Sequence, residues 1–388
     1  MANSPLHSVR VLDFSKLLPG PFCTKILSDL GCQVIKVELP HWPDIMRTMP
    51  PLLGREGAVF SALHSRKKSF CVDFKKPEGL QILFELLATA DVLVEGFRPG
   101  LMRRIGLGPE VLLKRFPKLI YCSLTGFGQS GPRSQRAGHD LNFLALSGLL
   151  SLGGPASAPA LPPIQIADIA GGSLYAAIGI LAALLERQRT GRGRRVDISM
   201  LEGILACGTV PLAYYHATGA KLRAGKMWWN GAHPFYNLYK TKDRRYVAVG
   251  ALEKGFALSL LSLIGRDDLK DRALSPFENQ KILSRELEKT FAQKTLRQWM
   301  EVFDGKDACV TPVYNLEEAV QAQKLPVRAL LAGTPLEMSG ARPSLSALRL
   351  GRHNVPLLKS LGYSAQKIRR LKASGVIADR PRRLGKVF

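Results

Sequence analysis

Strand-like and helix-like segments alternate through the first third of the chain, and this alternation restricts the fold more than any other feature of the sequence. The short apolar segments typical of buried strands are Val9–Phe14, Gln33–Glu38, Ser69–Phe74, Asp91–Glu95 and Leu119–Leu124. The longer segments typical of helices are Phe22–Leu30, Glu78–Ala90 and Pro109–Phe116. Because strands that are joined through helices pair in parallel, the pattern predicts an α/β fold with a Rossmann-like, doubly wound parallel sheet.

The pattern changes near residue 219 and predicts a second, smaller domain. Gly219–Gly231 is rich in Gly and Lys and looks like a linker. A hairpin follows, with Phe235–Lys240 and Arg245–Gly250 as its strands, and shorter helices come after it. We expect a large domain over residues 1–218, a small α+β domain over residues 232–330, and a C-terminal segment over residues 331–388.

Two titratable side chains, His139 and Asp168, each stand where a loop runs into an apolar segment. The large apolar residues of the second segment share one helical face: Leu174, Ile178, Leu181 and Leu185. A carboxylate just before a helix is favoured by the unpaired N–H groups there, and the same groups can hold an oxyanion. Two plainer alternatives stay open, a helix cap for Asp168 and a hydrogen-bonded core position for His139.

The most apolar run of the chain, Ile169–Leu185, predicts a buried helix. It contains three glycines and many alanines, and it is short for a membrane span. We therefore expect no membrane-spanning segment.

The formal net charge of +24 suggests an anionic partner. The basic residues are spread along the chain, with ten Lys or Arg against one acid, Asp379, from Arg352 onward. Aromatic residues are few and no RNA-binding signature interleaves them with the charges, so we expect no nucleic-acid partner. Part of the charge suits a substrate that carries phosphates, and the remainder has no explanation in the sequence.

The cysteines and histidines argue against a disulfide scaffold and a metal site. None of the six cysteines stands in a C-x-x-C pair, and the seven histidines contain no H-E-x-x-H pattern. These features fit a reducing, cytoplasmic location. The first predicted strand is not followed by G-x-G-x-x-G, so no dinucleotide is indicated and we expect no cofactor.

Several ordered motifs resemble the class III CoA-transferase family (CaiB/BaiF type), and most of all its α-methylacyl-CoA racemase branch. They include V-L-D-F-S-K-L-L-P-G-P-F-C-T, E-G-F-R-P-G-L-M-R-R-I-G-L-G, G-H-D-L-N-F-L-A-L-S-G-L-L, A-D-I-A-G-G-S and P-F-Y-N-L-Y-K-T-K-D-R-R-Y-V-A-V-G-A-L-E. The resemblance covers nearly the whole chain. It implies a large Rossmann-like domain built from both chain ends, a smaller middle domain, and a homodimer of two subunits threaded through each other as interlocked rings.

In chemical terms the resemblance implies a racemase of 2-methyl-branched acyl-CoA thioesters. His139 and Asp168 match the two acid–base groups that flank the carbon next to the thioester carbonyl and exchange its proton through an enolate. Glu253 matches a carboxylate that orients the histidine, and Asp140 matches a supporting residue, although a helix cap is an equal alternative for Asp140. The backbone N–H groups of Asp168 and Ile169 are candidates for the enolate site.

The resemblance also assigns residues to the CoA part of the substrate. By position these are Val72, Lys75, Gly96, Phe97, Arg98 and Arg104, with Lys67 and Lys68 as weaker candidates. Two departures affect the phosphate contacts. Leu39 stands where the family often has a basic residue, and H-S-R-K-K-S over His64–Ser69 replaces the family's N-R-N-K-R-S.

Transferase chemistry of the same family is the main alternative. There the aspartate that matches Asp168 forms an anhydride with the acyl group and passes CoA to another carboxylic acid. Two features favour the racemase: the position of His139 is usually not histidine in the transferases, and their glycine-rich loop has no counterpart between Asn230 and Glu253. A binding protein without enzymatic activity is a third, weaker alternative.

Overall fold

The computed structural model describes residues 4–155, 157–274, 281–324, 326–336, 345 and 347–381, and the chain divides into two compact units. Unit 1 comprises Met1–Ser147, Pro163–Cys207 and Pro326–Phe388, so both ends of the chain belong to it. Unit 2 comprises Gly148–Pro162 and Gly208–Leu325. The second part of unit 2 begins at Gly208, where one helix, Met200–Cys207, ends and the next, Thr209–Thr218, begins.

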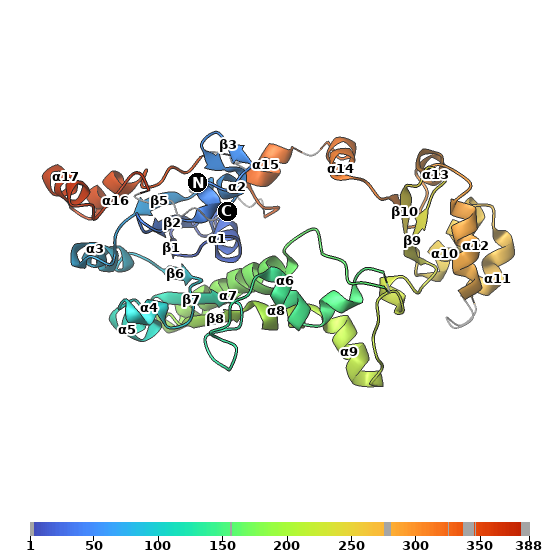
Figure 1. Ribbon diagram of the computed structural model, residues 1–388, viewed down its shortest axis with the longest axis horizontal. Coiled ribbons are helices and arrows are strands. Elements are labelled where there is room, and N and C mark those ends of the chain that lie inside the picture. Colours follow the sequence, from blue (N-terminus) through green and yellow to red (C-terminus); the bar gives the residue numbers. More distant parts are fainter. Residues whose placement is uncertain are drawn as a thin grey trace. The chain divides into compact units, whose positions relative to one another are not determined.

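A six-stranded parallel sheet forms the centre of unit 1 and confirms the predicted α/β fold class (Figure 1). Its strands are β1 (Arg10–Asp13), β2 (Gln33–Glu38), β5 (Lys68–Cys71), β6 (Val92–Glu95), β7 (Ile120–Thr125) and β8 (Arg195–Ser199). Their order is β5-β2-β1-β6-β7-β8, and Leu12 of β1 lies between Ile35 of β2 and Leu93 of β6. The chain reverses its direction across the sheet at β1, and ligands of open α/β sheets bind beyond the carboxyl ends of the strands at such a point.

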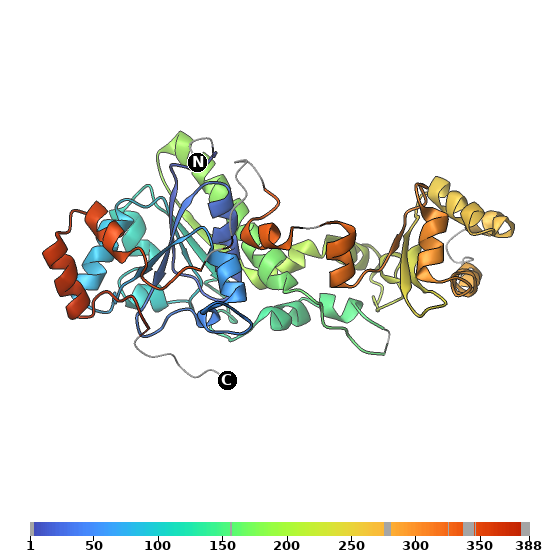
Figure 2. The ribbon, with the colours of Figure 1, turned by 90° about the horizontal axis from the view of Figure 1, so that it is seen from above.

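Helices cover both faces of this sheet (Figure 2). Alternate strand residues such as Leu12 and Tyr121 pack into one apolar core with helices α3 (Pro77–Leu87), α4 (Leu101–Arg104), α5 (Pro109–Arg115), α16 (Asn354–Ser360) and α17 (Ala365–Ala373). On the other face lie α1 (Pro19–Asp29) and α7 (Tyr175–Thr190). Because both faces are buried, the central strands are apolar almost throughout.

The C-terminal segment is attached to the edge strand β5. The side-chain oxygen of Asn354 accepts a hydrogen bond from the Cys71 N–H at 2.9 Å, and its amide group donates to the Ala378 carbonyl at 2.8 Å. The Ser69 N–H donates to Nδ1 of His353 at 3.0 Å. These bonds satisfy backbone groups that an edge strand would otherwise leave unpaired.

Charged side chains are buried in unit 1 near the carboxyl ends of β1 and β2. Lys67 pairs with Asp13 at 3.1 Å, Lys36 with Asp44 at 3.3 Å, and Arg47 with Glu38 at 2.5 Å. Burial opposes the ionisation of Asp13, but the Lys67 and Lys36 ammonium groups outweigh it and lower the pKa of Asp13 to about 2. The pairs join the ends of the strands to the loops that follow them.

The remaining elements of unit 1 are short or lie around the site. They are η1 (Ile45–Arg47), β3 (Leu52–Leu53), β4 (Glu56–Gly57), α2 (Ala58–His64), α6 (Asp140–Leu146), η3 (Ala167–Leu174), α8 (Met200–Cys207) and α15 (Val327–Ala332).

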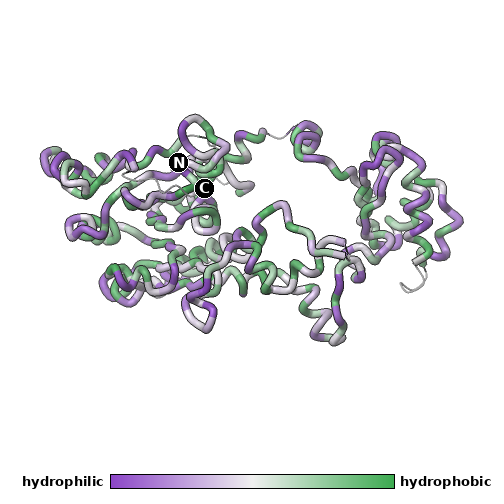
Figure 3. The backbone as a smooth tube through the Cα atoms, viewed as in Figure 1, coloured by the Kyte–Doolittle hydropathy of each residue, from purple (hydrophilic) through white to green (hydrophobic). Residues whose placement is uncertain are grey.

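The apolar face of α7 is not buried in the way the sequence predicted. The segment η3–α7 is largely hydrophobic (Figure 3), but Ile178 and Leu185 are 62% and 64% exposed. Small residues such as Ala176 and Ala183 face the sheet instead. Small side chains let the helix approach the sheet closely, and this leaves its large side chains outside.

The same segment, Ala167–Thr190, is the one helix among the described residues that is long and apolar enough to cross a membrane. A single such helix is weak support for a span, since core helices have the same composition. Gly171, Gly172 and Ala177 are buried within unit 1, which fits a core helix.

Unit 2 is built on a three-stranded antiparallel sheet with the order β11-β10-β9. Its strands are β9 (Tyr236–Lys240), β10 (Tyr246–Gly250) and β11 (Val310–Pro312). Its helical elements are η2 (Leu149–Leu152), α9 (Thr209–Thr218), η4 (Trp228–Asn230), α10 (Lys254–Leu263), η5 (Asp267–Leu269), α11 (Lys270–Ala273), α12 (Lys281–Phe291), α13 (Leu296–Phe303) and α14 (Leu316–Ala322). Tyr239 and Val247 pack against Phe291 and Trp299 in its core.

Substitution of Gly203 tests the close packing of η3 on α8. A Cβ atom at Gly203 would overlap the carbonyl oxygen of Gly171, so Gly203→Ala should lower the free energy of unfolding by about 1–3 kcal/mol. Gly255→Ala is the matched control, because its Cβ meets nothing within 4 Å in α10 and should stabilise the helix by about 0.5–1 kcal/mol. Denaturant unfolding followed by circular dichroism measures both. A Gly203→Ala protein as stable as the wild type would contradict this packing.

Candidate active site

His139 is the residue that precedes helix α6, at the end of the loop that follows β7. Its backbone is extended, and its N–H donates to Oδ1 of Asn142 at 3.0 Å. A Cβ atom at Gly138 would lie 2.6 Å from the Phe143 ring, so only glycine fits directly before the histidine. The imidazole is exposed. The G-H-D-L-N-F motif thus presents an exposed imidazole on a fixed backbone.

Asp140 links His139 to Asp168. One carboxylate oxygen of Asp140 accepts hydrogen bonds from two backbone N–H groups, that of Ala167 at 2.7 Å and that of Asp168 at 2.9 Å. These groups belong to the first turn of η3, which would otherwise leave them unpaired. The side chain next to the histidine therefore fixes the backbone of the second candidate acid–base residue.

Asp168 lies in a π-helix. The segment η3 has the wider π-helical turn, which is rare and is often found at functional sites. The Ser173 hydroxyl donates to the Pro19 carbonyl at 2.7 Å and lies 3.0 Å from the Asp168 carbonyl, which joins η3 to the loop after β1. The sequence predicted an ordinary helix here. Periodicity did not reveal the wider turn, because it depends on packing against α8.

The expected donors for an enolate oxygen are already in use. The Asp168 N–H donates to Asp140, and the Ile169 N–H donates to the Gln165 carbonyl at 3.0 Å. Neither of these two N–H groups is without an acceptor in this structure. The sequence spacing suggested that these N–H groups lie at a helix end without partners. In the structure the Asp140 carboxylate and the Gln165 carbonyl accept their hydrogen bonds.

The carboxyl group of Asp168 is set for proton transfer near neutral pH. Burial, and then the negative charge of Asp140, raise the pKa of Asp168 from 3.8 to about 7. A strongly perturbed carboxyl group at the end of a parallel sheet is a candidate for catalysis, because acid–base groups work best when their pKa is near the working pH.

The residues expected to bind CoA follow the carboxyl ends of strands β5 and β6. Val72 and Lys75 come after β5, and Gly96, Phe97 and Arg98 come after β6. The structure thus brings residues about 20 positions apart in sequence to one edge of the sheet. The rest of this set is Arg104, in α4, with Lys67 and Lys68 at the start of β5.

These residues differ in how accessible they are. Arg98, Arg104, Lys75 and Lys68 are exposed, and Val72 is fully buried. Lys67 is also buried. Its ammonium group lies 3.1 Å from Asp13, 2.9 Å from the Pro21 carbonyl and 2.7 Å from the Thr24 hydroxyl. An ammonium group has three donors, so Lys67 has none left for a phosphate in this structure.

Glu253 lies in unit 2, where it directly precedes helix α10. It therefore lies in the short connection between β10 and α10. Its role beside the histidine rests on the resemblance and stays a prediction.

Glu95 is a titratable residue of this edge that the sequence analysis missed. It is the last residue of β6 and is almost fully buried, and burial raises its pKa to about 7. Its carboxyl oxygen accepts the Phe97 N–H at 2.9 Å and so shapes the Gly96–Arg98 loop. The sequence V-L-V-E-G could have indicated this residue, because an acidic side chain ends an apolar strand there, just before a loop that contains glycine.

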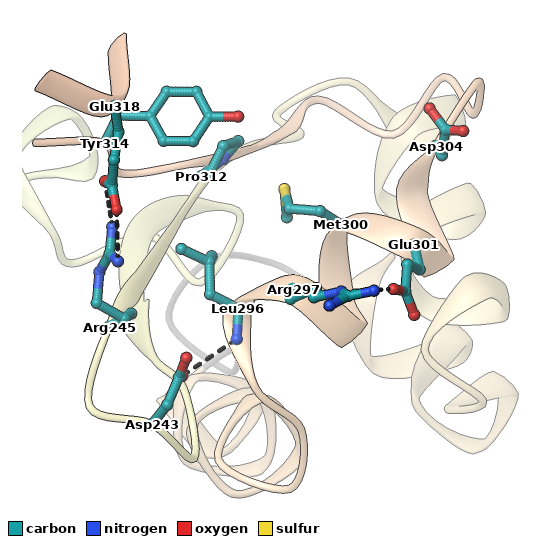
Figure 4. A pocket seen from close by; sticks show the side chains of 10 residues that line it. All are labelled: Asp243, Arg245, Leu296, Arg297, Met300, Glu301, Asp304, Pro312, Tyr314 and Glu318. Atoms are coloured by element: carbon teal, nitrogen blue, oxygen red, sulfur yellow. Dashed lines mark hydrogen bonds and ion pairs between the residues drawn. The ribbon is translucent and has the colours of Figure 1, made fainter. Parts of the chain in front are cut away.

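A pocket of about 510 Å³ in unit 2 is a poor site for the phosphates of CoA (Figure 4). Arg245 pairs with Glu318 at 2.6 Å and Arg297 with Glu301 at 3.1 Å, so both arginines that line it are neutralised. Asp304 adds a further negative charge. A second hollow in unit 2, of about 590 Å³, is lined more by apolar and aromatic groups, such as Trp229, Tyr236 and Leu238. It suits an apolar group better than a charged one.

Comparison with known proteins identifies the relatives of this chain. The model of CoA-transferase family III matches residues 6–356. The α-methylacyl-CoA racemase of Mus musculus is 38% identical, over 96% of this chain and 97% of its own length. The succinyl-CoA:glutarate CoA-transferase of Mus musculus is 36% identical, over 96% of this chain and 90% of its own length. The crystal structure of a CaiB/BaiF family protein from Brucella suis has a TM-score of 0.78 at 29% identity, and the match covers 92% of this chain and all of that one.

The raised pKa of Asp168 predicts a distinct dependence of stability on pH. Between about pH 4 and pH 7 the folded protein holds a proton on Asp168 that the unfolded chain releases, so this group makes stability fall as pH rises. Asp168→Asn should remove that fall. Asp140→Asn, which keeps an oxygen acceptor for the two N–H groups, should move the fall to lower pH because it removes the neighbouring charge. Urea unfolding from pH 4 to pH 8 measures both. Parallel curves for wild type and Asp168→Asn would contradict the raised pKa.

Proposed function

The chain belongs to CoA-transferase family III, and we propose that within this family it is a racemase of 2-methyl-branched acyl-CoA thioesters. The observation that carries the proposal is the link through Asp140 between the exposed imidazole of His139 and the carboxyl group of Asp168, whose pKa is raised. Racemisation needs two acid–base groups on opposite sides of one carbon. The racemase among the relatives supports the same reading.

In the proposed reaction one group removes the α-proton and the other returns a proton to the opposite face. The electron pair of the broken C–H bond moves into the thioester to give an enolate, and protonation of the α-carbon restores the carbonyl. With a pKa of about 7, Asp168 exists in both its protonated and ionised forms near neutral pH. It can therefore serve as the base in one direction and as the acid in the other. His139 is the proposed partner for the other face.

The CoA part of the substrate is proposed to bind at the carboxyl edge of the sheet. Arg98, Arg104, Lys75 and Lys68 are exposed cations that suit its phosphates. Gly96 is exposed and Phe97 is partly exposed beside the Arg98 side chain, whereas the side chain of Val72 is fully buried and offers no surface. Glu253 is proposed to orient His139, as the family resemblance implies.

The second candidate function is transfer of CoA between carboxylic acids, and the transferase among the relatives supports it. In that reaction the ionised carboxylate of Asp168 attacks the thioester carbonyl and expels the CoA thiolate, which leaves an acyl-aspartyl anhydride. Only the ionised form of Asp168 is a nucleophile. With a pKa of about 7 this form is present near neutral pH, so the pKa of Asp168 is compatible with either reaction.

We also propose that the protein is a homodimer. Ile178 and Leu185 form an exposed apolar stripe on α7, with Leu174 on η3 continuing it, and Val210 and Tyr215 are exposed on α9. Large exposed apolar groups on neighbouring turns of a helix are typical of protein interfaces. The family resemblance implies the interlocked arrangement of the two subunits.

Solvent exchange distinguishes the two enzymatic candidates. In D2O, a racemase should introduce deuterium at the α-carbon of a 2-methylacyl-CoA with no acid acceptor present. His139→Gln and Asp168→Asn should each lower the rate of epimerisation by roughly 10²- to 10⁴-fold, since each removes a proton-transfer group. Arg189→Gln, an exposed change on α7, is the control and should have no effect.

Two results would reject the racemase assignment. One is near-normal epimerisation by Asp168→Asn. The other is transfer of CoA to a free carboxylate without α-deuteration, with Asp168 trapped by hydroxylamine as its hydroxamate, which would establish the transferase.

The apolar stripe predicts the assembly state of the protein. Ile178→Asp should shift the protein from dimer to monomer in light scattering coupled to size exclusion, because a charge would be buried at the interface. Lys114→Glu reverses a charge at an exposed position of α5, outside the stripe, and should leave the dimer intact. A wild-type protein that is monomeric at all concentrations measured would contradict the proposed dimer.

A further inference from the structure

The C-terminal helices carry a concentrated positive charge. Between Asn354 and Arg380 the sequence has six Lys or Arg and one acid, Asp379. This acid pairs with Lys372 at 2.6 Å, so most of the positive charge is not balanced within the segment. Helices α16 and α17 lie at the outer edge of unit 1, on the left in both views (Figure 1 and Figure 2). Part of the positive charge of the chain is thus gathered at one place on its surface.

Helix α17 turns its arginines outward because its apolar side chains are used in the core. Ile368 and Leu371, three residues apart on one face, are 6% and 4% exposed and pack into the core of unit 1. Arg369 and Arg370 follow Ile368, and at about 100° per residue both lie on the opposite side of the helix. Both are exposed. The outer face of α17 is therefore cationic and carries no large apolar group.

Lysines border the two arginines. The Lys367 ammonium group lies 4.3 Å from the centroid of the Tyr363 ring, a contact that leaves its charge in place. Lys359, in α16, is a further exposed cation. Glu85 of α3 is half-buried and accepts a hydrogen bond from Tyr363, so it balances part of this charge. The surface formed by α16 and α17 nevertheless stays positive.

Helix α17 is fixed on unit 1 at both of its ends. The Ser364 hydroxyl accepts a backbone N–H of the first turn at 3.2 Å and so caps the helix. After the last turn, the Lys76 ammonium group donates to the Ser374 carbonyl at 2.7 Å. The Asp73 N–H donates to the Val376 carbonyl, also at 2.7 Å. The backbone that carries the cations is therefore ordered in advance, which lowers the entropic cost of binding a partner.

The outer face of α17 stays accessible in the proposed dimer. Helices α16 and α17 pack on one face of the parallel sheet, and α7 packs on the other. The proposed contact between subunits uses Ile178 and Leu185 of α7. That contact does not cover α17.

We propose that α17 is a docking surface for a bilayer that contains anionic phospholipids, with Arg369 and Arg370 at its centre. The phosphates of such lipids form a broad negative surface, and clusters of about four to eight Lys and Arg on a helix bind it. Because the apolar side chains of α17 are buried in the core, the contact is electrostatic and does not enter the hydrocarbon. It is therefore reversible and weakens with salt. The proposal does not depend on the proposed racemase activity.

A lipid surface fits these residues better than a nucleic acid does. Proteins bind single strands through aromatic rings that stack on the bases. The segment from Asn354 to Arg380 has one aromatic residue, Tyr363, and Lys367 lies over its ring. A duplex needs no such ring, and it therefore serves as a competitor in the experiment.

Vesicle flotation with the intact protein measures the binding. The wild type should bind vesicles of phosphatidylcholine and phosphatidylglycerol, mixed in about a 2:1 ratio, and should not bind phosphatidylcholine alone. It should be released at about 1 M salt, where the screening length falls to about 3 Å. Arg369→Gln combined with Arg370→Gln should lower the partition coefficient roughly 30-fold, since each cation near an anionic surface contributes about a factor of five. Unchanged binding by this double variant would overturn the proposal.

Two matched variants separate the charge of α17 from other effects. Arg369→Lys combined with Arg370→Lys keeps the charge and should keep the binding. Lys240→Gln combined with Lys242→Gln removes the same charge at exposed positions of unit 2 and should also leave the binding in place. If the unit 2 variant lost as much binding, the total charge of the protein would explain the effect and the docking surface would be rejected. All these side chains are exposed, so each variant should melt at the wild-type temperature.

Three competitors identify what α17 binds. Glycerol phosphate, a single headgroup, should not displace the vesicles, because the surface needs several phosphates at once. Displacement by glycerol phosphate or by CoA would indicate a site for one small anion and overturn the proposal. Tighter binding to a DNA duplex than to vesicles, with the same dependence on Arg369 and Arg370, would assign the surface to nucleic acid instead. Epimerisation of a soluble acyl-CoA should be unchanged in the Gln variant of α17, so either proposal can fail without the other.

Discussion

The candidate site depends on one carboxylate, that of Asp140. It accepts hydrogen bonds from the first two N–H groups of η3, and it stands next to His139 in the chain. Its position therefore fixes the backbone of both candidate acid–base residues at once. Its charge has a second effect, because together with burial it raises the pKa of Asp168 to about 7. The Asp140 carboxylate thus acts on both the backbone geometry of the site and the pKa of Asp168.

Buried ion pairs fix the loops after β1 and β2 in a similar way. The pairs Lys36–Asp44 and Arg47–Glu38 hold the loops after β1 and β2, and Lys67 pairs with Asp13 beneath them. Removing charges from water is costly, so pairs of this kind are weak support for stability. Their contribution here is to specify the loop geometry. The N–H of Leu17, in the loop after β1, donates to Asp44 of this network at 3.2 Å.

The family includes racemases and transferases, and the same aspartate can serve either chemistry. What separates them in physical terms is the presence of a second acid–base group. A carboxyl group with a pKa of about 7 is present in both its protonated and its ionised form at neutral pH, so it suits either reaction. The exposed imidazole of His139 fits the role of the second acid–base group in racemisation.

The sequence by itself determined the parallel α/β fold and brought out His139, Asp140 and Asp168, because strand and helix periodicity and short motifs are local properties of the chain. Strand Gln33–Glu38 has the predicted bounds for this reason. Only the tertiary structure decided which groups are free. It engaged the N–H groups of Asp168 and Ile169, used up the donors of Lys67, and turned Ile178 and Leu185 outward. It also brought Lys16, Trp42 and Phe97 together. Hydrogen-bond partners, burial and contacts between distant loops depend on how the elements pack, and no local pattern records that.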